Sequence, residues 1–153
     1  MIHKTDLAYM AGIVDGEGCI DIYKHKAAKR SVREYRYTMR LTVGMGRPEL
    51  PKRLLSLFGG TVHISKPVNS NRSAEWRWSV SSRKAMRVLK EVLPFLFLKK
   101  DQAKIAIELQ TLQSGWRKEF GGIATPQSVI DKEDELWIEL KSKRGRKYRE
   151  AQM

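Results

Sequence analysis

Met10-Ala11-Gly12-Ile13-Val14-Asp15-Gly16-Glu17-Gly18 is an apolar helical pattern that ends in two acidic residues set among glycines. With Thr5 as the N-cap, it predicts a helix of about three turns that ends where the glycines begin. Asp15 and Glu17 then lie at the negative end of the helix dipole, which disfavours carboxylates by a few tenths to about 1 kcal/mol. Two acids at this end therefore indicate a cation nearby.

The same helix carries small residues on one face. Counted from Ala8, the small residues Ala11 and Gly12 follow after three and four positions, and the acid Asp15 follows after seven. Such a face is flat and allows a second helix backbone to approach closely. An ordinary helix with a glycine C-cap and a solvated acidic turn has the same pattern, so the rest of the chain must distinguish the two interpretations.

Length and charge indicate one basic domain. The chain has 153 residues, with 30 Lys and Arg against 17 Asp and Glu, for a net charge of +13. This charge favours a polyanionic partner, and nucleic acid is preferred over a membrane because no run of 18 or more apolar residues occurs. The N-terminus lacks a signal-peptide pattern, and the single Cys19 fits a reducing compartment. We expect a protein that is not secreted, in a prokaryotic (archaeal) cytoplasm or an organellar matrix.

Alternating hydrophobicity predicts two pairs of strands. The first pair is Cys19–His25 and Tyr35–Val43, joined by a basic loop, and the second is Thr61–Ser65 and Glu75–Val80. The residues expected to face the core are Tyr35, Tyr37, Met39, Leu41, Val43, Val62, Ile64, Trp76, Trp78 and Val80.

Helical periodicity occupies the remaining segments. The expected helices are Pro48–Phe58, Ser82 to the break at Pro94, about Lys99–Ser114 with Trp116 beyond its end, and about Pro126–Leu140. Residues 1–140 would form the domain, and residues 141–153 a basic C-terminal tail. The order predicts an α+β fold with one antiparallel sheet covered on one side.

The opening segment resembles the LAGLIDADG motif of homing endonucleases. Met10 stands for the first Leu, Ile13-Val14 for Leu-Ile, Gly16 for the second Ala and Glu17 for the last Asp. The αββαββα order, obtained from periodicity alone, matches one half of that fold, with a saddle-like sheet and further C-terminal helices. The resemblance implies a site-specific double-strand DNA endonuclease of the intron-homing type, which cuts across the minor groove and leaves short 3′ overhangs.

Because the motif occurs once, the resemblance implies a homodimer on a pseudo-palindromic DNA target. Ala8, Ala11 and Gly12 would pack against their mates and bring two Glu17 side chains together. Gly16, through its carbonyl, and Glu17 would hold Mg²⁺ shared between the subunits, since like charges so close need a cation. Asp15 would be mainly structural.

Pro94–Ala103 resembles the family segment that supplies a basic residue to the active site. The alignment selects Lys99 as a catalytic residue, with Lys100 as the alternative. One departure lies at the end of the second strand, where some members place a water-positioning Gln or Asn and this chain has Met45-Gly46. A nearby polar residue would have to substitute there, or water would suffice; the candidates are Arg40, Thr42 and Arg47.

The outer faces of the strands are the expected DNA-reading surface, because a two-stranded ribbon fits the major groove. The candidates are Asp21, Tyr23, His25, Arg36, Thr38, Arg40, Thr42, His63, Ser65, Glu75 and Arg77, with the arginines as guanine readers. In the basic tail, the expected phosphate contacts are Lys143, Arg144, Arg146 and Lys147. A charged strand face that is merely solvated remains the alternative for the sheet.

Two rival functions use the same fold. An RNA-binding intron maturase, with intron RNA as its partner, would need the basic surface but no metal chemistry. A DNA-binding regulator that has lost catalysis would retain the fold, and the departure at Met45 would be its first sign.

Overall fold

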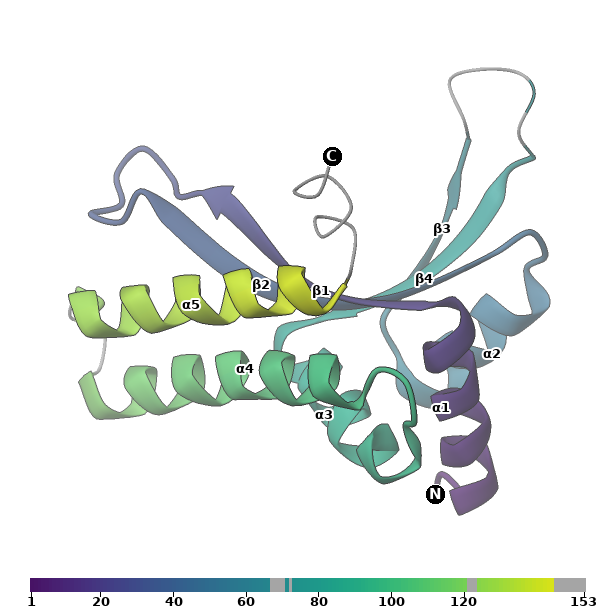
Figure 1. Cartoon of the computed structure of the whole chain (residues 1–153). Helices are drawn as coiled ribbons and strands as arrows, with labels where there is room; N and C mark the ends of the chain where they lie inside the picture. The colour runs from purple at the N-terminus through teal and green to yellow at the C-terminus, as the bar shows by residue number, and fades with distance from the viewer. Residues whose placement is uncertain (67–70, 72, 121–123, 145–153) are drawn as a thin grey trace, which may run out of the picture.

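The computed structural model describes residues 1–66, 71, 73–120 and 124–144 (Figure 1). Four antiparallel strands form one sheet in the order β1-β2-β4-β3. The strands are β1 (Gly18–Lys26), β2 (Tyr35–Met45), β3 (Thr61–Ser65) and β4 (Glu75–Ser81). Figure 1 shows the sheet curving upward at both sides, with the helices gathered on its convex face. Among the residues that the structure describes, no helix covers the concave face.

The helices follow the predicted order. They are α1 (Lys4–Glu17), α2 (Glu49–Phe58), α3 (Ser82–Val92), a 3₁₀ turn at Leu93–Phe95, α4 (Lys100–Phe120) and α5 (Gln127–Lys143). The predicted αββαββα plan with further C-terminal helices is confirmed. None of the helices in the described ranges is both long and apolar enough to cross a bilayer.

The core lies between the convex face of the sheet and the helices. Of the inward residues of β2, Tyr37, Met39, Leu41 and Val43 are buried as predicted and Tyr35 is partly buried. Trp78 of β4 is fully buried, and its indole nitrogen donates to the Gly59 carbonyl at 2.8 Å. Ile64 is an exception to the predicted pattern, because its side chain is 45% exposed. It lies on β3, the outer strand, where less helix surface covers the sheet.

Three predicted boundaries were wrong. His3, rather than Thr5, caps α1, because the Asp6 carboxylate accepts a hydrogen bond from the His3 amide at 3.3 Å. Helix α4 continues to Phe120, so Trp116 lies inside it; packing against α5 extends the helix past the Ser-Gly pair that looked like a stop. Helix α5 continues to Lys143, so the expected boundary after residue 140 falls within a helix.

Candidate active site and nucleic-acid interface

The end of α1 runs directly into β1. The Gly18 amide donates to the carbonyls of Ile13 and Val14, and its backbone is extended, with φ −77° and ψ 150°. A Cβ at Gly18 would lie 2.7 Å from the Val14 Cα, so glycine is needed here for close approach rather than for a positive φ. This tight junction leaves Glu17 exposed as the last helical residue.

Asp15 joins the end of α1 to the start of α4. Its carboxylate accepts hydrogen bonds from the backbone amides of Phe97 at 2.8 Å, Leu98 at 3.1 Å and Lys99 at 2.9 Å. These amides immediately precede α4, whose N-terminus is the positive end of its dipole. Asp15 therefore has the structural role that the resemblance implied.

Lys99 places its ammonium group at the negative end of α1. The Nζ atom donates to the carbonyl of Val14 at 2.8 Å and to that of Gly18 at 2.5 Å. Burial lowers the pKa of Lys99, while the nearby carboxylates of Asp15 and Glu17 oppose that shift. The two acids at the end of α1 predicted a nearby cation, and the Lys99 ammonium is such a cation.

Glu17 is available for a ligand. Its side chain is exposed, and the described residues offer it neither a hydrogen bond nor an ion pair. In the part of the chain that the structure describes, no three His, Cys, Asp or Glu residues gather into a metal-binding group. A carboxylate suits a hard cation such as Mg²⁺, but one protomer offers a single such group here. A complete metal site would need oxygen ligands from a second source.

The small-residue face of α1 differs from the prediction at one position. Ala8 and Gly12 are exposed, and a Cβ at Gly12 would meet nothing within 4 Å. Ala11 is fully buried in the core of its own chain, so its assignment to a subunit interface was wrong. The exposed stripe contains Tyr9 instead, with its side chain 57% exposed.

The strand register brings most of the predicted DNA-reading residues onto the concave face. Across β1 and β2, Tyr23 lies opposite Thr38 and His25 opposite Arg36. Across β3 and β4, the register pairs residues of the same set: His63 with Arg77 and Ser65 with Glu75. The Arg40 guanidinium stacks over the Tyr23 ring at 4.5 Å, and Thr42 is half-buried on the same face.

Asp21 does not fit the base-reading role. It is 6% exposed, and its carboxylate binds the Lys141 ammonium at 2.9 Å and the Arg144 guanidinium at 2.6 Å. These contacts hold the end of α5 on β1, which explains why the helix extends past the expected boundary. Arg144 is engaged in the same ion pair, whereas Lys143 is half-exposed and lies 3.6 Å from Asp101. Two further predicted contacts lie outside the described residues: Arg146 and Lys147.

The end of β2 offers little for positioning water. Met45 packs against the core, and the Glu75 carboxylate fills the space above Gly44 while pairing with Arg77 at 2.6 Å. Arg47 is exposed and pairs with Glu49 at 2.7 Å. Met45, which stands where some family members have a water-positioning Gln or Asn, therefore points toward the core and away from the concave surface.

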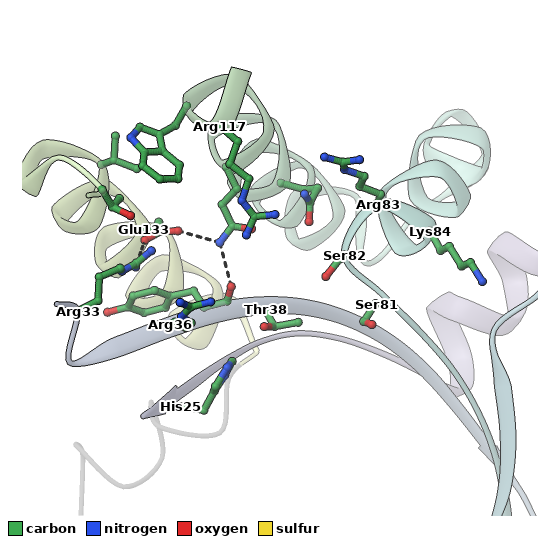
Figure 2. A pocket seen from close by; sticks show the side chains of 16 residues that line it. His25, Arg33, Arg36, Thr38, Ser81, Ser82, Arg83, Lys84, Arg117 and Glu133 are labelled. Carbon is green, nitrogen blue, oxygen red and sulfur yellow. Dashed lines mark hydrogen bonds and ion pairs between the residues drawn. The ribbon is translucent and has the colours of Figure 1, made fainter. Parts of the chain in front are cut away.

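Sequence reasoning missed a basic cavity at the free edge of β2 (Figure 2). Arg83, Lys84 and Arg117 line it together with Arg36 of the concave face. The Ser-Ser-Arg-Lys segment at the junction of β4 and α3 was a usable signal. No sequence signal pointed to Arg117, because the helix was expected to end near Ser114, before this residue.

No protein-family model matches the sequence, and no curated protein sequence matches it. Solved structures do match. The homing endonuclease I-CvuI, in complex with a DNA target in the presence of Mg, has a TM-score of 0.74 at 21% identity, over 92% of this chain and 82% of that chain.

Two other solved structures share the fold. An archaeal intron-encoded homing endonuclease, I-Vdi141I, complexed with DNA, gives a TM-score of 0.72 at 13% identity, over 91% of this chain and 84% of that one. I-SmaMI bound to uncleaved DNA in the presence of calcium ions gives a TM-score of 0.61 at 20% identity, and the match covers 86% of this chain and 43% of that chain. With these neighbours and the motif at the end of α1, the chain has the fold of the LAGLIDADG homing endonucleases.

Proposed function

We propose that this chain is a site-specific double-strand DNA endonuclease that works as a homodimer with a divalent cation at Glu17. The observation that carries the proposal is the end of α1, where an exposed carboxylate adjoins the ordered ammonium of Lys99. This pair lies where α1 enters the curved sheet. The structural neighbours supply the class of reaction, since they are homing endonucleases and several are bound to DNA.

The concave face is the proposed DNA-binding surface. Arg36 and Arg40 are exposed on β2, and Arg77 on β4, as suits bidentate contacts with guanine in the major groove. The Tyr23 ring beneath Arg40 restricts that guanidinium before DNA arrives, which lowers the entropic cost of binding. The proposed set is Tyr23, His25, Arg36, Thr38, Arg40, Thr42, His63, Ser65, Glu75 and Arg77, with phosphate contacts from Lys143, Arg146 and Lys147.

A second copy of the chain is the proposed partner of α1. Tyr9 is 57% exposed, Phe97 86% and Leu98 69%, so large apolar side chains are exposed both on α1 and on the loop before α4, where a partner could cover them. Because Asp15 holds the amides of Phe97 and Leu98, this apolar loop lies beside the exposed stripe of Ala8 and Gly12. A two-fold axis along that stripe would bring both copies of Glu17 together.

The donor set at the paired helix ends fits Mg²⁺. Glu17 would bind it through a carboxylate oxygen and Gly16 through its carbonyl, and these are ligands that hard cations prefer. When bound, the cation would activate water and stabilise negative charge on the phosphate. Lys99 would add positive charge beside the phosphate. The carbonyls of Val14 and Gly18 keep its ammonium oriented.

Cleavage of the host gene that lacks the intron tests the proposal. With Mg²⁺, the wild-type protein should cut both strands and leave short 3′ overhangs, while Glu17→Gln should bind the same DNA without cutting. The matched control Glu135→Gln removes an exposed carboxylate on α5 and should cut normally. Intact DNA with the wild-type protein, together with faster splicing of the intron RNA, would replace the endonuclease proposal with the maturase function.

A further inference from the structure

A cavity of about 640 Å³ lies at the free edge of β2. Strand β4 pairs with β2 from Arg40 to Met45, so among the described residues the first part of β2 has no neighbouring strand on that side. The chain leaves β4 there to begin α3, and the Gln113 side chain of α4 reaches the carbonyl of Tyr37 at 2.9 Å. Figure 2 shows side chains from these elements converging on one space.

The cavity is strongly basic. Five cationic side chains line it, and the carboxylate among the lining residues is that of Glu133, which is 1% exposed and already pairs with Arg33. The other four cations have no carboxylate partner among the described residues: Arg36, Arg83, Lys84 and Arg117. Four cations around one space repel one another unless an anion joins them.

Three residues that line the cavity also carry buried polar atoms without partners. In the described part of the chain, three buried side-chain atoms lack a hydrogen bond: Arg33 Nε, Gln110 Oε1 and Trp116 Nε1. All three residues line the cavity, and Gln110 is only 3% exposed. Since buried polar groups are nearly always satisfied, the wall of this cavity keeps unused hydrogen-bonding capacity next to its cations. The Ser114 hydroxyl bound to Gln110 can donate or accept, so the amide can present either atom.

The start of α3 adds backbone donors. Ser81, the N-cap residue, makes no side-chain capping hydrogen bond, and Ser82 has φ 52°, in the left-handed region that favours glycine. Both serines line the cavity. The first amides of an 11-residue helix and its positive dipole end therefore remain available to an anion.

We propose that this cavity binds a phosphate group of the DNA backbone, outside the base pairs nearest the cleavage position. The inference rests on the proposed function. His25, Arg36 and Thr38 line the cavity and also belong to the concave face, so a strand bound there passes the opening. Cys19 lies at the start of β1, beside the proposed cleavage site, and His25 lies near its far end. Their separation of six residues spans about 20 Å along the strand, which is the length of about six base pairs of DNA.

The Trp116 indole N–H reports on the cavity, because Trp116 lines it and its Nε1 has no partner among the described residues. In a ¹⁵N-labelled sample the chain has four indole signals, and Trp116→Phe identifies the relevant one. Titration with inorganic phosphate should shift the Trp116 signal and leave the other three in place. Arg83→Gln with Arg117→Gln should abolish the shift. The control Lys132→Gln, which removes a cation paired with Glu135, should preserve it.

The salt dependence of DNA binding distinguishes the source of the phosphate. On a long duplex, the double variant should reduce the slope of log K against log salt by about 1, whereas a duplex trimmed to the central base pairs should show no difference. If phosphate shifts the Trp116 signal but the wild type and the double variant have equal salt slopes on both duplexes, the cavity binds a free phosphate compound, and the DNA assignment is overturned. No shift of Trp116 with either phosphate or duplex would overturn the site itself. Failure of DNA cleavage would leave the phosphate titration unaffected, so the two proposals fail separately.

Discussion

The carboxylate of Asp15 accepts a hydrogen bond from the Lys99 amide at 2.9 Å, and the Lys99 ammonium returns to the carbonyls that close α1. The two residues thus connect the negative end of α1 with the positive end of α4. This exchange explains how the chain tolerates two acids at a helix C-terminus. Asp15 is stabilised by the amides at the start of α4, and the Lys99 ammonium lies near Glu17.

Replacing Asp15 with Ala should lower the free energy of unfolding by about 2 kcal/mol. Three backbone amides lose a charged acceptor, and water recovers only part of that interaction. Urea denaturation measures the change. Asp131→Ala, which removes a carboxylate that contacts Gln127 on the exposed face of α5, should stay within about 0.5 kcal/mol of wild type. Equal losses in the two variants would contradict the bridging role of Asp15.

Lys99→Met should reduce DNA cleavage by about 10²-fold while leaving the dissociation constant for target DNA nearly unchanged. The ammonium supplies positive charge at one place beside Glu17, and the methionine side chain keeps the volume without the charge. Single-turnover cleavage and gel-shift titration separate the two quantities. Lys100→Met, on the adjacent residue, is the matched control and should cut at the wild-type rate. A larger loss for Lys100→Met would reverse the assignment.

The stability of the fold should fall in acid partly through Asp134. Hydrogen bonds from Lys24 and Tyr37 lower the pKa of Asp134 below its ordinary value of 3.8. A carboxyl group whose folded-state pKa is depressed stabilises the fold above its unfolded pKa, and this contribution is lost as the pH falls through the folded value. Urea denaturation from neutrality to about pH 3 should therefore show a smaller acid loss for Asp134→Asn than for wild type. Parallel curves would contradict this contribution.

Local periodicity predicted the element order, but it did not identify partners that come from distant sequence. Alternation placed Asp21 on the concave face correctly. Its burial depends on Lys141 and Arg144, which approach from the opposite end of the chain. Ala11 was misassigned because helical spacing defines a broad stripe and does not reveal which edge of the stripe packs on the core. The cavity around Arg117 is lined by residues of six elements, β1, β2, β4, α3, α4 and α5, so no local sequence pattern predicted it.

The exposed stripe of α1 gives the sharpest test of dimer formation. Gly12→Leu should yield a folded monomer, because Gly12 is exposed, a Cβ there would meet nothing within 4 Å, and leucine favours a helix by up to about 1 kcal/mol over glycine. In a dimer, the same side chain would prevent close approach of the two helices. Analytical ultracentrifugation should show the dimer in wild type and its loss in Gly12→Leu. Ala11→Leu lies one residue away but faces the core, so it should lower stability by about 1–3 kcal/mol through overpacking. If Gly12→Leu stays dimeric with unchanged affinity, the subunits do not meet along this face.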